Sequence, residues 1–154
     1  MTRTITATDL IGSWHLSIWQ VVTTIDGERQ AAVYPFGRRP SGLLIYSADG
    51  WMSATVSRAD RSIFPAGQSP RKLDDVTVAE AYLSYFHYAG RWRLEGDQVI
   101  HSVILSHNPN MTGTEQVRRM TLKPGRLSLA GEESFGDRQR LHQLDWRREM
   151  TDND

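Results

Sequence analysis

The feature that most constrains this chain is a series of short segments in which apolar and polar residues alternate, each ending near Gly, Pro, Asn or Asp. A period of two is typical of β-strands with one buried face, and pairs such as Asp26-Gly27 and Asp49-Gly50 are typical of tight turns between strands. Strands are predicted at residues 14–24, 43–47, 51–56, 90–94, 99–107, 114–122, 126–130 and 141–148.

Short connections favour antiparallel neighbours, and eight strands close a barrel wide enough for one small ligand. A chain of 154 residues has the length of one domain with its own core. We therefore predict one all-β domain over residues 1–154, with its core in residues 10–148, folded as an eight-stranded antiparallel up-and-down β-barrel. The tail 151–154 is expected to fray.

One segment has helical periodicity. Thr77-Val-Ala-Glu80 fits a capping box, in which the threonine and glutamate side chains satisfy the first backbone donors of a helix. Tyr82 and Phe86 follow at helical spacing, and Gly90 is suited to end the segment. The sequence predicts one short helix inserted after the third strand.

The two ends of the strand series contain residues that could hold a barrel closed. Gly12-Ser-Trp14 opens the first strand, and Arg148 closes the last. A tryptophan that fills one end of a barrel, with an arginine over its ring, is stabilised by about 0.5–2 kcal/mol. We expect Arg148 in this structural role, with Arg147 as the alternative if the last strand slips by one residue.

Composition excludes several functions. The 18 Lys and Arg balance the 18 Asp and Glu, so no basic surface for nucleic acid or a membrane is expected, and the absence of cysteine excludes thiolate chemistry. No apolar run reaches the roughly 20 residues of a membrane span, and Met1–Asp9 lacks the apolar stretch of a secretion signal. A cytoplasmic location is the expectation. Without a glycine-rich phosphate loop, no nucleotide or other cofactor is predicted.

Several segments, in this order, resemble one family. They are Gly12-Ser-Trp14, Gly42-Leu-Leu-Ile-Tyr-Ser-Ala-Asp-Gly50, Tyr88-Ala-Gly-Arg-Trp92, His101 with Ser106-His-Asn-Pro109, Gly113-Thr-Glu-Gln-Val-Arg118 and Asp145-Trp-Arg-Arg148. The chain is similar to the bacterial and fungal lipocalin-like domain family of the calycin superfamily. The resemblance implies an eight-stranded barrel with a cup for a small, mostly apolar molecule, and no single activity. Two departures, the helix after the third strand and the missing secretory features, argue against the carrier roles of secreted lipocalins.

Arg118 is the first candidate for a site. Residues on one strand alternate between inside and outside, so Met120 and Leu122 predict that Gln116 and Arg118 also point inward. An interior guanidinium needs acceptors, because an unpaired buried charge costs several kcal/mol. Arg118 could bind a substrate carboxylate, enolate or phenolate. The alternative is a structural pair with an internal carboxylate or with backbone carbonyls.

His101 is the second candidate, because Val99, Val103 and Leu105 predict that it points inward together with His107. A histidine there could move a proton near neutral pH, or could be a hydrogen-bonded core residue. The two histidines are about 20 Å apart along an extended strand, so they cannot share a metal ion. No metal site is predicted. Tyr46 and Tyr85 are candidate acids if they lie at the mouth of the barrel.

Three hypotheses remain open. The first is a barrel that binds a small hydrophobic molecule with a polar or anionic group, in a wall formed by Trp19, Met52, Trp92, Leu105, Gln116, Met120 and His142. The second is a cofactor-independent isomerase, cyclase or lyase, with His101, Arg118 and Tyr46 or Tyr85 as its catalytic groups. The third is a structural domain with a filled barrel. Trp51 is expected to be exposed, which leaves a homodimer open.

Overall fold

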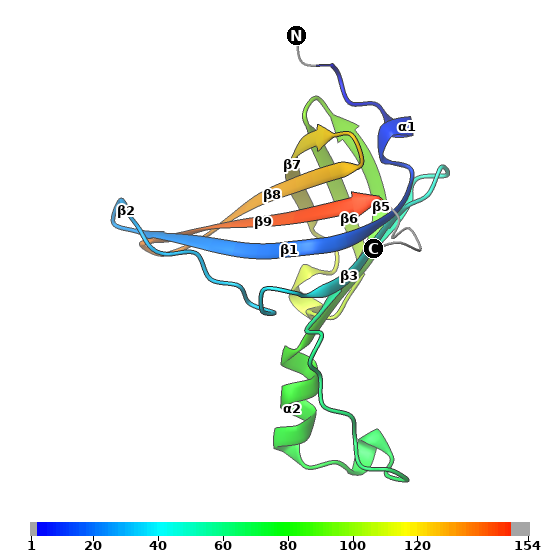
Figure 1. The fold of residues 1–154 in the computed structure, drawn as a ribbon, viewed down its shortest axis with the longest axis vertical. Coiled ribbons are helices and arrows are strands. Elements are labelled where there is room, and N and C mark those ends of the chain that lie inside the picture. The colour runs from blue at the N-terminus through cyan, green and yellow to red at the C-terminus, as the bar shows by residue number, and fades with distance from the viewer. Residues whose placement is uncertain (1–2, 149–154) are drawn as a thin grey trace.

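The chain forms antiparallel strands that follow one another around a barrel (Figure 1). The computed structural model describes residues 3–148; the tail 151–154 lies outside the described residues. The strands are β1 Gly12–Ile25, β2 Glu28–Arg29, β3 Ser41–Tyr46, β4 Trp51–Ser57, β5 Tyr85–Glu95, β6 Gln98–Ser106, β7 Glu115–Lys123, β8 Arg126–Phe135 and β9 Arg138–Arg148. Two α-helices, α1 Ala7–Leu10 and α2 Asp75–Leu83, and two 3-10 turns, Pro70–Lys72 and Pro109–Met111, complete the elements in this part of the chain.

The barrel closes between its first and last long strands. Neighbours pair in the order β1, β3, β4, β5, β6, β7, β8, β9, and β9 pairs back onto β1 from Trp14↔Arg148 to Ile25↔Arg138. The short strand β2 forms a hairpin with the end of β1, joined by the predicted turn at Asp26-Gly27, and Ile25 pairs with Glu28. The predicted eight-stranded antiparallel up-and-down barrel, with a helix after the third long strand, is confirmed.

Trp14 fills one end of the barrel, as predicted. Its side chain is 1% exposed, and its Nε1 donates to the carbonyl oxygen of Leu10 at the end of α1, at 2.9 Å. The guanidinium of Arg148 lies 3.9 Å from the centre of the Trp14 ring. The structural role expected for Arg148 is therefore confirmed.

Helix α2 has different ends from those predicted. Its N-cap is Asp74, whose carboxylate accepts a hydrogen bond from the backbone of Thr77 at 2.8 Å, so Thr77 lies in the first turn. The helix ends at Leu83, and residues from Tyr85 onward belong to β5. Gly90 does not end a helix: a Cβ there would lie 1.9 Å from the carbonyl oxygen of Ser102. The backbones of β5 and β6 approach closely at Gly90, and only glycine fits.

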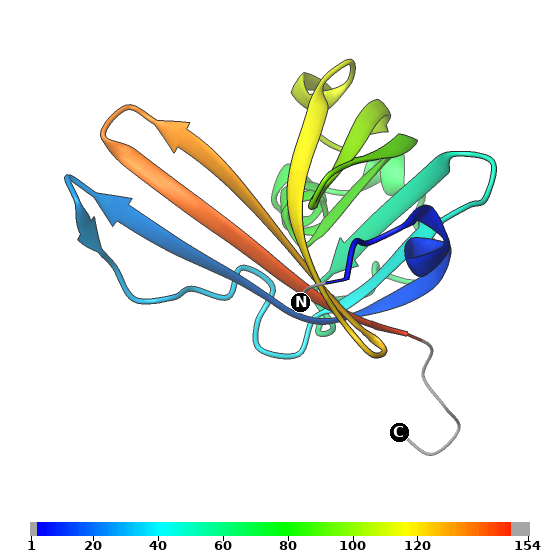
Figure 2. The ribbon, with the colours of Figure 1, turned by 90° about the horizontal axis from the view of Figure 1, so that it is seen from above.

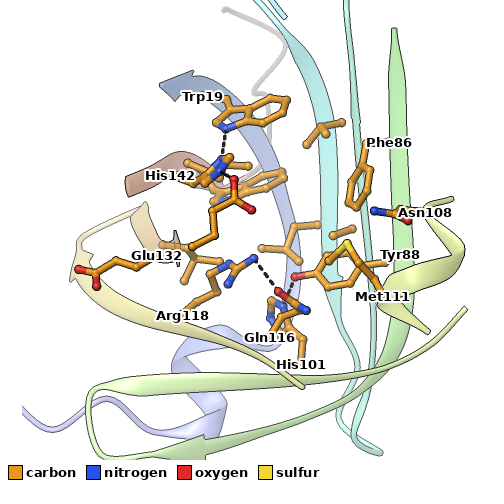
Figure 3. A pocket seen from close by; sticks show the side chains of 18 residues that line it. Trp19, Phe86, Tyr88, His101, Asn108, Met111, Gln116, Arg118, Glu132 and His142 are labelled. Carbon is orange, nitrogen blue, oxygen red and sulfur yellow. Dashed lines mark hydrogen bonds and ion pairs between the residues drawn. The ribbon is translucent and has the colours of Figure 1, made fainter. Parts of the chain in front are cut away.

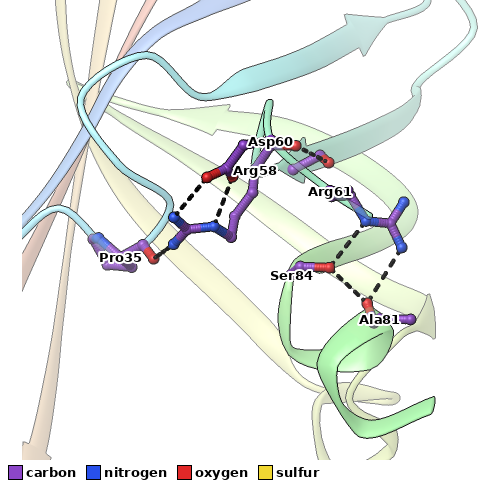
Figure 4. A network of polar contacts seen from close by, with 7 residues as sticks. Pro35, Arg58, Asp60, Arg61, Ala81 and Ser84 are labelled. Carbon is purple, nitrogen blue, oxygen red and sulfur yellow. Dashed lines mark hydrogen bonds and ion pairs between the residues drawn. The ribbon is translucent and has the colours of Figure 1, made fainter. Parts of the chain in front are cut away.

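Residues 58–84, here called the arm, project from the barrel between β4 and β5 (Figure 1). No residue of α2 is buried. Figure 4 shows how the arm is held at its base: Arg61 donates from Nε to the Ser84 hydroxyl at 2.9 Å and from Nη2 to the carbonyl of Ala81 at 3.3 Å. Arg58 pairs with Asp60 beside it. Arg61 thus supplies donors to the last turn of α2, where carbonyl groups lack helical partners.

Two β-bulges reverse the direction of side chains along their strands. In β1 the pairing with β9 shifts between Leu16 and Ile18, so that Trp19 returns to the inside. Between β5 and β6 the pairing shifts at Ala89 and Gly90, and Leu105 becomes 62% exposed. The prediction that Leu105 and His107 point inward is wrong, because one extra residue moves every later side chain to the other face.

The hydrogen-bonded ladder between β7 and β8 is short. It runs from Lys123↔Arg126 to Arg119↔Ala130 and stops there, so residues 115–118 and 131–135 are not paired with each other. Figure 2 shows β8 and β9 spreading away from β7. We call the boundary between residues 115–118 and 131–135 the seam. No helix of the described chain has the length and apolar character needed to cross a membrane.

Candidate functional site

A cavity of about 320 Å³ lies inside the barrel, next to the seam (Figure 3). Its wall is mostly apolar and is formed by Trp19, Leu44, Ala54, Val56, Phe86, Met111, Leu129, Leu144 and Trp146. The polar or charged residues that line it are Tyr88, His101, Asn108, Gln116, Arg118, Glu132, Glu133 and His142. This size and this mixture are typical of sites for small organic molecules. The third hypothesis required an interior filled by side chains, and this cavity contradicts it.

His101 is buried between two tyrosines. Its side chain is 1% exposed, its Nε2 lies 2.7 Å from the hydroxyl of Tyr46, and its Nδ1 lies 2.5 Å from the hydroxyl of Tyr88. The three residues come from β3, β5 and β6, so the barrel itself fixes their geometry. His101 is thus hydrogen-bonded at both ring nitrogens, and both His101 and Tyr88 line the cavity.

Burial keeps these three groups uncharged. Burial, and to a lesser extent the nearby Arg118 guanidinium, lower the pKa of His101 to about 3. Burial also raises the pKa of the Tyr46 and Tyr88 phenols above their usual value, an effect that Arg118 opposes. At neutral pH His101 is therefore a neutral imidazole between two neutral phenols, with the Arg118 guanidinium nearby.

Arg118 lines the cavity from β7. Its Nη1 donates to the carbonyl of Val117 at 3.0 Å, and its Nη2 donates to Oε1 of Gln116 at 3.4 Å. Within residues 3–148, no carboxylate oxygen lies within 4.0 Å of its guanidinium. In Figure 3, Glu132 extends away from Arg118. Two neutral oxygens are weak partners for a half-buried cation, so the guanidinium retains donors for an anion.

The Arg118 side chain occupies the place where the β7–β8 ladder would continue. A Cβ at Gly131 in β8 would lie 2.5 Å from Nη1 and 2.9 Å from Cδ of Arg118. A second hollow of about 230 Å³ lies on the other side, lined by Val117, Arg119 and residues 130–132 among others. Arg118 therefore packs against the backbone of Gly131 at the seam, and Gly131 borders both the cavity and this second hollow.

Three further hydrogen-bonded residues line the cavity: Trp19 from β1, His142 from β9 and Glu133 from β8. Nε1 of Trp19 donates to Nδ1 of His142 at 3.2 Å, and Nε2 of His142 lies 2.7 Å from Oε1 of Glu133. Because Nδ1 accepts, the ring proton must be on Nε2, where it is donated to the carboxylate. Phe36, from the loop after β2, packs edge-on against Trp19 at 4.9 Å. This group is satisfied within the protein.

The structure brings only some of the predicted site residues together. His101, Arg118, Trp19, Gln116 and His142 line the cavity. The other predicted residues do not line it and occupy three kinds of position: buried core for Tyr46, Met52 and Met120, the edge of the core for Trp92, and the outer surface for Leu105 and Tyr85. Trp92 donates to the carbonyl of Ser47 at 3.0 Å, which is a structural contact.

Tyr85 was expected on a helix beside the mouth of the barrel, and that placement is wrong. It is the first residue of β5, and its ring lies under the Arg61 guanidinium at 5.1 Å and edge-on to His107 at 5.8 Å. His107 in turn lies 2.9 Å from the carbonyl of Tyr82 in α2. Both residues contact the arm, and neither lines the cavity.

Sequence reasoning missed Tyr88 as a site residue. Helical spacing through Phe86 assigned it to the helix, but Phe86, Tyr88 and Gly90 also alternate, and in β5 the first two point into the cavity. The alternation that continues to Trp92 is the signal that could have placed the start of this strand earlier.

One protein family model matches nearly the whole chain. Residues 11–149 match the family model of the lipocalin-like domain. An uncharacterized protein from Bacteroides eggerthii, known from a crystal structure, is 13% identical, with a TM-score of 0.36 over 87% of this chain and 98% of that one. No curated protein matches this sequence. Because the family model matches most of its length, this chain belongs to the lipocalin-like domain family.

Proposed function

We propose that this barrel binds a small, mostly apolar molecule that carries an anionic or strongly hydrogen-bond-accepting group, and that Arg118 binds this group. One observation carries the proposal: the Arg118 guanidinium lines an apolar cavity, and within residues 3–148 it has two neutral oxygens and no carboxylate as partners. A cation in such surroundings is better satisfied by a charged acceptor than by amide oxygens.

The walls of the cavity support the apolar part of the ligand. Trp146 and Leu129 are buried residues on one side, and Ala54 and Val56 are buried residues on the other. Each square ångström of apolar ligand surface removed from water contributes about 25 cal/mol. A cavity of about 320 Å³ lies at the lower end of the range for small-molecule sites, which favours ligands of one or two rings.

The experiment is a calorimetric titration of the protein with 2-naphthoate, a two-ring aromatic carboxylate, and with Arg118→Gln as the variant. We expect the variant to bind about tenfold or more weakly, because a charged hydrogen bond is lost. Arg119→Gln is the matched control, because Arg119 is the next residue of β7 and is exposed. Equal affinity of Arg118→Gln and the unchanged protein would overturn the proposal. Native mass spectrometry of the protein from its own host would identify the natural ligand.

A second candidate is a cofactor-independent isomerase, cyclase or lyase that acts on the same kind of molecule. It is supported by the hydrogen-bonded series Tyr46–His101–Tyr88, which ends at the cavity. With its pKa lowered to about 3, His101 is neutral at pH 7, so Tyr88 and not an imidazolium would supply a proton. Protein-dependent exchange of the α-hydrogens of 2-tetralone in D₂O, followed by NMR, tests this candidate. A rate equal to that of buffer alone argues against it.

A further inference from the structure

The hydrogen bonds of His101 have a direction that the chemistry of the groups determines. Both ring nitrogens are engaged, Nε2 by the Tyr46 hydroxyl at 2.7 Å and Nδ1 by the Tyr88 hydroxyl at 2.5 Å. A neutral imidazole has one N–H donor and one acceptor nitrogen. Burial lowers the pKa of His101 to about 3, so the neutral form is present at pH 7. One tyrosine therefore donates its proton to His101, and the other accepts a proton from it.

The surroundings of the two hydroxyls differ. Tyr46 is 1% exposed and does not line the cavity, and within residues 3–148 its hydroxyl has no hydrogen-bond partner besides His101. If Tyr46 accepted from Nε2, its own proton would be buried without an acceptor, which is unfavourable. If Tyr46 donates to Nε2, its proton is satisfied.

If Tyr46 donates to His101, the O–H of Tyr88 is available to donate a hydrogen bond elsewhere. With Nε2 as the acceptor, the ring proton is on Nδ1 and is donated to the Tyr88 oxygen. Tyr88 lines the cavity, so its own O–H can be directed there. In Figure 3 its hydroxyl lies beside Gln116 and His101, on the side toward which Arg118 extends. Arg118 is near enough to influence the charge of both tyrosines and of His101.

The geometry points to a fixed order, in which Tyr46 donates to Nε2 of His101, Nδ1 of His101 donates to Tyr88, and Tyr88 donates into the cavity. Tyr88 is then a specificity-determining residue. The identity of its acceptor rests on the proposed function: a ligand oxygen that Arg118 also binds. The site would select a carboxylate, enolate or phenolate and would reject an ammonium group, since Tyr88 and Arg118 both offer protons there.

The order of the hydrogen bonds is tested without any ligand. Long-range ¹H–¹⁵N correlation spectra of the full-length protein, uniformly labelled with ¹³C and ¹⁵N, distinguish a protonated from an unprotonated ring nitrogen. The His101 signals are assigned through bonds to its backbone, so no substitution at the buried position is required. We expect the proton on Nδ1 at pH 7. A proton on Nε2 would overturn the inference.

The role of Tyr88 in selection is tested with two probes of similar shape, 2-naphthoate and 2-methylnaphthalene, of which only the first has an acceptor. We expect Tyr88→Phe to weaken 2-naphthoate binding by about 10-fold or more and 2-methylnaphthalene binding by less than about twofold. Tyr85→Phe is the matched control, the same substitution three residues earlier on β5 and outside the cavity lining. An equal loss for both probes would overturn selection by Tyr88, because it would show a packing effect.

The two levels of the proposal fail separately. If the unchanged protein binds neither probe while Nδ1 carries the proton, the proposed function fails and the order of hydrogen bonds is supported. If the protein binds 2-naphthoate through Arg118 while Nε2 carries the proton, the order fails and the proposed function is supported.

Discussion

The guanidinium carbon of Arg148 lies 3.9 Å above the centre of the Trp14 ring. The same guanidinium donates from Nη1 to the carbonyl of Ile11 at 2.8 Å and from Nη2 to the carbonyl of Asp9 at 2.6 Å. The last strand thus covers the tryptophan that fills the barrel and also holds the segment before β1. Gly12 makes room for this contact, because a Cβ there would lie 2.8 Å from Nη1 of Arg148.

Arg148→Gln should therefore destabilise the whole barrel. The substitution removes the contact of the cation with the ring and weakens two charged hydrogen bonds, and we expect a loss of about 2–4 kcal/mol in the free energy of unfolding. Urea denaturation measures it. Arg126→Gln, at an exposed position of β8, is the control and should change the stability by less than about 0.5 kcal/mol. A similar, small effect of both substitutions would contradict the closing role of Arg148.

The stability of the protein should fall as the pH falls below the usual pKa of histidine. Because the pKa of His101 is lowered from 6.5 to about 3 in the folded protein, the unfolded chain binds a proton between these values and the folded chain does not. The stabilisation is complete above pH 6.5 and decreases by about 1.4 kcal/mol per pH unit below it, until the pH reaches about 3.

This pH effect is measured by urea denaturation between pH 7.5 and 4.5, a range above the pKa of the paired carboxyls such as Asp9, whose pKa is lowered from 3.8. Comparison with His101→Gln isolates the contribution of the histidine, because the quantity compared is the slope of the unfolding free energy against pH and not the stability at one pH. We expect this slope to be smaller in His101→Gln by about 1.4 kcal/mol per pH unit, which corresponds to one proton. The same slope in both proteins would contradict this prediction, because it would show that His101 binds a proton as readily in the folded protein as in the unfolded chain.

Two glycine substitutions should affect stability and binding to different extents. In Gly131→Ala the three atoms nearest to the new methyl group all belong to the flexible side chain of Arg118, so we expect a loss of less than about 1 kcal/mol in stability but weaker binding of 2-naphthoate. In Gly90→Ala it meets the backbone of Ser102 at 1.9 Å, and we expect a loss of several kcal/mol. Thermal unfolding and calorimetry together separate the two effects; reduced binding of 2-naphthoate without reduced stability is the signature expected for Gly131.

The arm should be cut by proteases before the barrel unfolds. No residue of α2 is buried, and Ile63 is 94% exposed. Arg61→Ala removes donors from the last turn of the helix, so we expect faster cleavage within residues 58–74 and little change in the unfolding of the barrel. Limited trypsin digestion followed by mass spectrometry locates the cuts. Cleavage that begins in β6 or β7 would contradict this expectation.

The sequence predicted the barrel because its determinants are local. Alternation and Asp-Gly turns define strands, and the residues at both ends of the series, Trp14 and Arg148, meet as expected. In β4, which pairs with β3 without a bulge, the alternating residues Met52, Ala54 and Val56 are all buried. Where a strand has no bulge, the alternation of apolar and polar residues is sufficient to predict which side chains point inward.

The candidate site was harder to predict, because it depends on irregularities that leave no local signal. The bulge opposite Gly90 moved Leu105 to the outside, and it lies where the backbones of the two neighbouring strands β5 and β6 approach closely. Tyr88 was assigned to a helix because the residues around it fit the periodicity of a helix as well as that of a strand. The pairing of this segment with β4 makes it a strand. Arg118 was placed inside correctly, but its position against Gly131 depends on where the β7–β8 ladder ends.

The early end of that ladder bears on how fast a molecule can reach the interior. In a barrel with continuous pairing, passage through the wall requires two strands to separate, an event of microseconds to seconds. At the seam no ladder bond between residues 115–118 and 131–135 has to break, and the group in the way is the Arg118 side chain. Rotamer changes of exposed side chains take picoseconds to nanoseconds, and a half-buried side chain such as Arg118 must first break its hydrogen bonds to Val117 and Gln116. Entry and exit at this point would then be timed by the rotation of one arginine.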